Sequence, residues 1–127
     1  MSAQDSYGIY FYKPEHGDYG WAGADHNVYG RAFLRAIDYR TGAFRWTHDL
    51  GDGPASAGVL TTASGVTFSG DSSGNLLALR TTDGSTLWHS SIGTVGNSPI
   101  TYELDGRQYL VVSGGGVLFG FALPEVK

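Results

Sequence analysis

The chain has 127 residues, with 8 Lys plus Arg against 12 Asp plus Glu, so its formal net charge at pH 7 is −4. This mild acidity argues against a nucleic-acid-binding surface, which needs clustered basic residues. The chain has no cysteine, which excludes disulfides, thiolate catalysis and Cys-based metal sites. No apolar run approaches the ~20 residues of a membrane span, and residues 1–5 lack the basic start and apolar core of a signal peptide. Twenty glycines and 13% aromatic residues favour an all-β domain of short strands and tight turns.

The N-terminal third has the least regular pattern. Tyr7–Tyr12 predicts a strand because it is rich in β-forming residues, and Pro14 ends it. Glu15–Asn27 holds glycines and charges and predicts a loop. Four polar residues of this loop are candidate metal ligands, although hydration is the more common fate of such side chains: His16, Asp18, Asp25 and His26. No segment shows helical periodicity, so we expect almost no helix.

A repeat of 42 residues organises the chain from residue 34 onward. Three residue types recur at this spacing: leucine (Leu34, Leu76, Leu118), glycine (Gly42, Gly84) and tryptophan (Trp46, Trp88). A period of about 40–45 residues with four strands per unit is typical of a β-propeller blade. We therefore predict about three four-stranded blades, the last lacking its outer strand. Since propellers need about four to eight blades, one chain would not close a ring.

The strand pattern within the repeats supports this prediction. The second repeat predicts four strands: Gly58–Thr62, Val66–Ser69, Leu76–Arg80 and Thr86–His89. The third predicts three: Ile100–Glu103, Gln108–Val112 and Val117–Ala122. Asp83-Gly84 and Asp105-Gly106 favour hairpin turns, because glycine accepts a positive φ without steric cost. The chain is thus interpreted as one propeller fragment with an irregular segment 1–50, a complete repeat 51–92 and an incomplete repeat 93–127.

The recurring tryptophans predict contacts between blades. Trp46 and Trp88 hold the same position in the repeat, which favours a packing role over ligand stacking. Each indole is expected to be buried between neighbouring sheets, with its N–H donating to a backbone carbonyl. His48 and His89 follow these tryptophans and are expected to point to solvent.

The turns that precede the tryptophans have their own chemistry. Asp38 is expected to accept hydrogen bonds from the amides of the Thr41-Gly42 turn. Gly84 stands at the position of Gly42 in the second repeat, but Arg80 stands at the position of Asp38. The second turn must therefore be stabilised by a different side chain.

Three short motifs invite other functions, but their surroundings do not support them. Gly70–Gly74 matches the G-x-S-x-G pattern of hydrolases, which requires a following helix, whereas a strand is predicted here. Asp71, Ser73 and Asn75 alternate like calcium ligands, but no bidentate Glu follows at the right distance. Gly114–Gly116 predicts a tight turn rather than a phosphate-binding loop. We expect no catalytic residue and no metal site in this chain.

The pattern Ala36-Ile37-Asp38-x-x-Thr41-Gly42-x-x-x-Trp46 resembles the tryptophan-docking repeat of quinoprotein alcohol dehydrogenases, which depend on pyrroloquinoline quinone (PQQ). Two further stretches are similar to the C-terminal part of that family: Ala57–Asp71, and Ser98–Tyr102 with the following Asp105-Gly106-x-Gln108-Tyr109. The resemblance implies a periplasmic protein whose propeller has eight blades and carries PQQ over a Ca²⁺ ion. This chain would correspond to the last blades alone.

The resemblance also implies which residues face the cofactor. Ser56, Ala57 and Gly58 match a segment beside the quinone, where many relatives have a Trp in place of Ser56. The catalytic Asp and the calcium-binding Glu and Asn of the family come from earlier blades, and nothing in this chain matches them. We therefore expect a fragment that is non-catalytic alone. The alternatives are a subunit of an assembled PQQ-binding oxidoreductase and a propeller interaction module.

An open arc of blades leaves sheet faces and strand edges exposed, which favours association. We expect a homo-oligomer or a partner chain that completes the propeller, with a strand such as Tyr7–Tyr12 of a neighbour added to the last blade.

Overall fold

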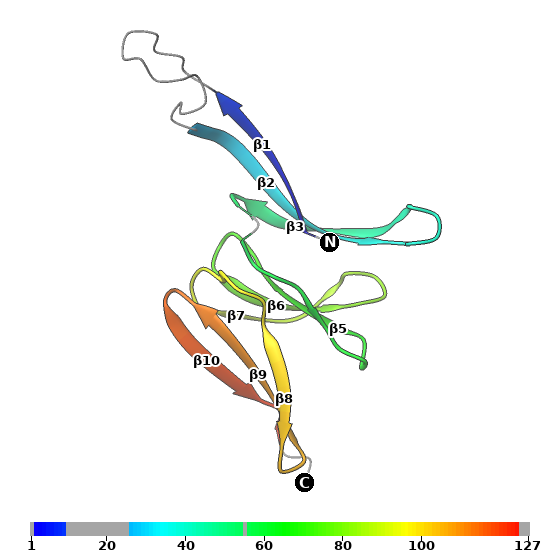
Figure 1. Cartoon of the computed structure of the whole chain (residues 1–127), viewed down its shortest axis with the longest axis vertical. Helices are drawn as coiled ribbons and strands as arrows, with labels where there is room; N and C mark the ends of the chain where they lie inside the picture. The colour runs from blue at the N-terminus through cyan, green and yellow to red at the C-terminus, as the bar shows by residue number, and fades with distance from the viewer. Residues whose placement is uncertain (1, 10–25, 55, 125–127) are drawn as a thin grey trace, which may run out of the picture.

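The computed structural model describes residues 2–9, 26–54 and 56–124, which form ten strands in three antiparallel sheets. The sheets follow one another along the long axis of the molecule and do not close into a ring (Figure 1). The described residues contain no helix, and hence none that could cross a membrane. The predicted all-β class and the open arrangement are confirmed for this part of the chain.

The first sheet contains β1 (Ser2–Ile9), β2 (His26–Ile37) and β3 (Phe44–Asp52), in that order. β1 begins five residues before the strand predicted at Tyr7–Tyr12, and residues 10–12 lie outside the described part of the chain. Residues 15–25 of the predicted loop also lie outside the described part of the chain. They include three of the four candidate metal ligands, His16, Asp18 and Asp25. The loop prediction was wrong at its end, because residues 26 and 27 already belong to β2. In the described residues this sheet has three strands rather than four.

The other two sheets agree closely with the strand pattern of the sequence. The second sheet has the order β4-β5-β6-β7, formed by β4 (Leu60–Thr61), β5 (Val66–Gly70), β6 (Asn75–Arg80) and β7 (Thr86–Ser91). The third has the order β10-β9-β8, formed by β8 (Ile100–Leu104), β9 (Arg107–Gly114) and β10 (Val117–Ala122). β4 is shorter than the strand predicted at Gly58–Thr62, because the Gly58 amide donates to the Asn97 carbonyl instead of to a sheet neighbour. The division of the chain at residues 50 and 92 stays a prediction.

Two tight turns build the third sheet. Asp105 and Gly106 both have positive φ, 52° and 74°, and connect β8 to β9. Aspartate is one of the few residues besides glycine that adopt this conformation readily. Gly115 and Gly116, with φ of 55° and 83°, connect β9 to β10 in the same way, so the tight-turn prediction for this glycine run is confirmed.

The core consists of two apolar clusters that lie between successive sheets. One joins the first sheet to the second and includes Leu34 and Leu79, and the other joins the second to the third and includes Leu76 and Val112. The repeated leucines show how this core is built. Leu34 and Leu76 are 1% and 0% exposed, whereas Leu118, at the same position of the third repeat, is 73% exposed. A leucine at this position is therefore buried only where a further sheet covers it.

Candidate functional site

Trp46 on β3 connects the first sheet to the second. Its indole Nε1–H donates to the carbonyl of Thr81, at a distance of 2.9 Å. The partly buried ring lies directly against Gly84, where an added Cβ would stand only 2.6 Å from the ring carbon Cε3. The contact joins β3 to the loop that follows β6, 35 residues later in the sequence, and has the geometry expected of a docking tryptophan.

His48, two residues after Trp46, takes part in the same contact. Its Nδ1 lies 2.9 Å from the carbonyl oxygen of Gly84, and its side chain is partly buried. The expectation that His48 points to solvent was wrong, because the loop of the second sheet folds over the end of β3. His89, at the corresponding place on β7, is exposed as expected.

The loop between β2 and β3 is held by Asp38. Its Oδ1 accepts hydrogen bonds from the amides of Arg40 and Thr41, at 2.9 and 3.3 Å, and the Gly42 amide donates to the backbone carbonyl of Asp38 at 2.8 Å. The side chain of Arg45 and these amides hold the pKa of the Asp38 carboxyl below its usual range. Asp38 thus stabilises the turn when its carboxyl group is ionised.

The loop between β6 and β7 has the same backbone but another carboxylate. The Gly84 amide donates to the Arg80 carbonyl at 2.8 Å, as Gly42 does in the first loop. Asp83 replaces Asp38 as the capping group, and its Oδ1 accepts from the amide and the hydroxyl of Ser85 at 2.9 and 2.6 Å. These bonds lower the pKa of the Asp83 carboxyl. The loop is therefore stabilised differently, as the replacement of aspartate by Arg80 predicted.

Trp88 does not repeat the environment of Trp46. It is 42% exposed, and its ring meets the edge of Phe121 with the centroids 5.3 Å apart and the planes at 78°. The prediction that Trp88 is buried between sheets was wrong. The indole of Trp46 contacts the loop that follows β6 in the second sheet. The corresponding loop for Trp88 would follow β10, and the described residues after β10 form no such loop.

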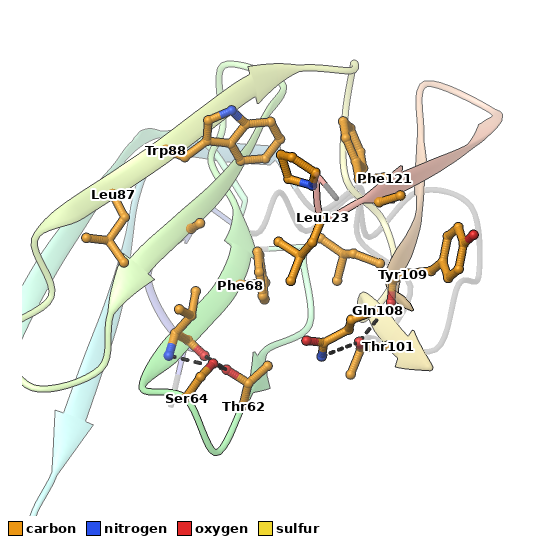
Figure 2. Close-up of a pocket in the computed structure, with 15 residues that line it drawn as sticks. Thr62, Ser64, Phe68, Leu87, Trp88, Thr101, Gln108, Tyr109, Phe121 and Leu123 are labelled. Carbon is orange, nitrogen blue, oxygen red and sulfur yellow. Dashed lines mark hydrogen bonds between the residues drawn. The ribbon is translucent and has the colours of Figure 1, made fainter. Parts of the chain in front are cut away.

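A pocket of about 500 Å³ lies beside Trp88, between the second and third sheets (Figure 2). Its walls are mostly apolar and include Phe68, Leu87, Phe121 and Leu123. Four polar residues lie along its lower rim in Figure 2 and bond to one another in pairs: Gln108 Nε2 donates to Thr101 Oγ1 at 3.0 Å, and the hydroxyls of Thr62 and Ser64 are 2.9 Å apart. The sequence pattern did not reveal this pocket, because it forms where the contact of the second tryptophan is incomplete.

The segment predicted to face the cofactor leads into β4, at the edge of the second sheet. Ser56 is exposed, and its Oγ donates to the carbonyl of Val95 at 3.1 Å. Ala57 is buried in the apolar cluster between the second and third sheets. Gly58 is pressed against Ser98, so no side chain fits at this position. The segment offers a neutral surface with a single hydroxyl. By itself it carries no charge that could balance the PQQ carboxylates.

The residues considered above as metal ligands have other roles where the structure describes them. Among the described residues, no three or more His, Asp or Glu side chains gather around one point. Asp71, considered above as a calcium ligand, instead caps its own hairpin: Oδ1 accepts from the amides of Ser73 and Asn75 at 3.0 and 2.8 Å. The Asp71 carboxylate is therefore occupied by the amides of its own turn.

The G-x-S-x-G sequence at residues 70–74 is a hairpin and not a nucleophile elbow. It connects β5 directly to β6. The central serine, Ser72, donates its hydroxyl to the carbonyl of Leu50 at 2.7 Å, and its amide donates to the same oxygen at 2.9 Å. Ser72 thus links the second sheet to the first, which is a structural role.

Comparison with known proteins agrees with this architecture. A family model described as outer membrane protein assembly factor BamB matches residues 30–123. The 1-butanol dehydrogenase (quinone) of Thauera butanivorans is 41% identical over 92 residues, which are 72% of this chain and 14% of that protein. Quinoprotein alcohol dehydrogenase PedH of Pseudomonas putida is 42% identical over 85 residues, 65% of this chain and 14% of that protein.

Solved structures give the same result. The crystal structure of quinohemoprotein alcohol dehydrogenase from Comamonas testosteroni superposes with a TM-score of 0.64 at 36% identity, over 68% of this chain and 13% of that one. BamB from Moraxella catarrhalis, with a TM-score of 0.52 at 20% identity over 81% of this chain and 38% of that one, shares the fold. The chain spans about a seventh of the length of the curated dehydrogenases cited above. It belongs to the family that the BamB model describes, and within that fold it is related to the PQQ-dependent alcohol dehydrogenases.

Proposed function

We propose that this chain forms propeller blades of an assembly that resembles a PQQ-dependent alcohol dehydrogenase. The chain alone would not catalyse alcohol oxidation. The observation that carries the proposal is the Trp46 contact, in which a tryptophan of one 42-residue repeat docks on the turn of the next. The identity of about 40% to quinoprotein dehydrogenases supports the same role. The blades would hold one wall of a redox centre that other blades complete.

The chemistry of the described residues supports a wall and not a complete site. The Ser56–Gly58 segment presents the Ser56 hydroxyl and backbone groups, because the methyl group of Ala57 is buried in the apolar cluster, and contacts to Val95 and Ser98 hold the segment in place. Such a surface can exclude water from a flat cofactor and limit its position, but it supplies no general acid or base. In this proposal the catalytic Asp and the Ca²⁺ ligands come from other blades.

A second candidate is a subunit of an assembled, active quinoprotein in which further chains rebuild the cofactor site. The relation to the 1-butanol dehydrogenase (quinone) of Thauera butanivorans favours it. For either candidate we infer a periplasmic location, in line with the family resemblance.

Titration of the purified chain with PQQ and Ca²⁺ tests whether copies of this chain rebuild the cofactor site, as the second candidate allows. Tryptophan fluorescence would follow binding, and dye-linked oxidation of a primary alcohol would follow activity. The proposal expects neither saturable binding nor oxidation by the chain alone. Stoichiometric PQQ binding together with alcohol oxidation would refute the non-catalytic role and establish the second candidate.

A chimera tests the blade role directly. The 85 residues of PedH that this chain matches would be replaced by the corresponding segment of this chain. We expect the chimera to fold and to keep PQQ-dependent alcohol oxidation, and we expect Trp46→Ala within it to reduce both. A chimera with native circular dichroism but no oxidation would show that this segment does not serve as a wall of the site.

A further inference from the structure

The pocket beside Trp88 has the size and the lining of a small-molecule site. Its volume of about 500 Å³ falls within the range of about 300–1,000 Å³ that is typical of such sites. Strands of the second and third sheets form its walls, and none of its lining residues belongs to the Ser56–Gly58 segment. Binding in this pocket is therefore independent of the residues assigned to the PQQ wall.

Aromatic rings form much of the apolar wall. Phe68 and Phe121 pack against the core cluster between the second and third sheets, which fixes both rings in place. Trp88 meets the edge of Phe121 and keeps 42% of its surface open (Figure 2). Aromatic faces held in this way favour a flat, unsaturated ligand that can stack on one ring or meet the edge of another.

The lining of the pocket carries no formal charge. Of the described residues that form it, none is Asp, Glu, Lys, Arg or His. An ionic group placed there would lose its hydration without gaining a counter-charge, which is strongly unfavourable. The pocket therefore favours a neutral ligand.

The polar rim of the pocket offers more acceptors than donors. The Thr101 hydroxyl donates its hydrogen to a backbone carbonyl of β9 at 2.8 Å and accepts from Gln108 Nε2 at 3.0 Å. The Thr62 hydroxyl donates to the Val66 carbonyl at 3.1 Å, so in its 2.9 Å contact with Ser64 the hydrogen comes from Ser64. Gln108 Oε1 and Ser64 Oγ remain as acceptors, and the second N–H of Gln108 is the one donor left among these four side chains. A ligand group that donates a hydrogen bond fits this rim.

We propose that the pocket binds a neutral, flat aromatic molecule that carries one hydrogen-bond donor. Its ring system packs on Trp88 and Phe121, and its N–H or O–H donates to Gln108 Oε1. The rings supply most of the affinity, because they remove apolar surface from water. The hydrogen bond supplies selectivity, because a ligand without a donor leaves this acceptor unpaired at the edge of an apolar site.

Three compounds with one ring system test the two requirements separately: indole, 1-methylindole, which lacks the donor, and indole-3-carboxylate, which is charged. Two-dimensional ¹H–¹⁵N NMR of the chain would follow the Trp88 indole N–H and the backbone amides of the pocket during each titration. We expect indole to bind with a dissociation constant of about 1 mM or lower. 1-Methylindole should bind about fivefold more weakly, and indole-3-carboxylate at least about tenfold more weakly.

Two variants assign the contacts. Gln108→Leu should weaken the binding of indole about fivefold and leave that of 1-methylindole unchanged, because it removes only the acceptor. Trp88→Ala should weaken the binding of both compounds about tenfold. Leu118→Ala is the control: Leu118 is 73% exposed on the third sheet and does not line the pocket, so this variant should bind like the wild type. Far-UV circular dichroism would verify that each variant is folded.

Four results would overturn the proposal. They are equal affinities for the three compounds, equal losses of indole and 1-methylindole binding in Gln108→Leu, shifts confined to residues outside the pocket, and no saturation by indole below about 10 mM. Acrylamide quenching of the wild type and of Trp88→Phe adds a further check. If Trp88 is shielded from acrylamide in the free protein, polypeptide already fills the pocket and the proposal fails.

Discussion

The contact between Trp46 and Gly84 can be measured with a pair of glycine substitutions. Gly84 and Gly42 hold the same position in two loops, with φ of 73° and 72°, and the amide of each donates to the carbonyl four residues earlier. Alanine at either position must adopt a left-handed conformation, which costs about 1–2 kcal/mol. Any difference between Gly84→Ala and Gly42→Ala therefore comes from what the new methyl group meets.

The surroundings of the two methyl groups differ sharply. At Gly42 no heavy atom lies within 4 Å of the added Cβ, whereas at Gly84 three atoms of the Trp46 ring lie between 2.6 and 3.2 Å from it. The ring must shift, which costs about 1–3 kcal/mol of overpacking and weakens a hydrogen bond to Thr81 worth about 1 kcal/mol. We expect Gly42→Ala to lower the free energy of unfolding by about 1 kcal/mol, and Gly84→Ala by about 3 kcal/mol or more.

Urea unfolding followed by far-UV circular dichroism would measure both variants without relying on the fluorescence of Trp46. A second readout, the emission maximum of the folded protein, should move to longer wavelength only in Gly84→Ala, because only there is the indole displaced toward water. Equal destabilisation by the two substitutions would mean that the indole does not rest on Gly84, and the docking argument would fail.

Two further predictions concern the same loops. Trp46→Phe removes the hydrogen bond to Thr81 and should lower the free energy of unfolding by about 1–2 kcal/mol. Trp88→Phe removes no such bond and should lower it by well under about 1 kcal/mol. Equal losses of stability in urea unfolding would contradict the different roles of the two tryptophans. The pKa of the Asp83 carboxyl is lowered by Ser85, so its stabilisation is complete above the unfolded value near 4 and is lost as the pH falls through the lower folded value. Between pH 5 and pH 2 the melting temperature of the wild type should therefore fall further than that of Asp83→Asn, and parallel pH profiles would refute the role of Asp83.

Local chemistry explains why much of the fold could be predicted from the sequence. Strands of the second and third sheets were located within about two residues, because each is bounded by residues whose conformational preferences are strong. Asp105-Gly106 and Gly115-Gly116 adopt the positive φ angles of tight hairpins, and this preference belongs to the residues themselves. The same is true of Asp38, whose short side chain reaches the amides of its own turn.

The environments of His48 and Trp88 could not be predicted in this way. The sequence shows their place on the outer strands, but the partner of each lies in another sheet. His48 acquires a neighbour because the Gly84 carbonyl reaches it. Trp88 keeps a large exposed surface because it meets Phe121 of β10 instead of a glycine-containing loop. Patterns within one strand carry no information on such contacts between sheets.

The repeated positions behave as in other repeat proteins, where stability is approximately a sum of terms within each unit and between neighbours. Leu34, Leu76 and Leu118 occupy equivalent places and share their chemistry, yet they are 1%, 0% and 73% exposed. What differs among them is the neighbour and not the residue. A covering sheet on the third blade, from any source, should therefore bury Leu118 to the level of Leu76. Hydrogen exchange of β10 would then slow toward that of β6, which makes this strand the most direct reporter of whether the arc of blades is extended.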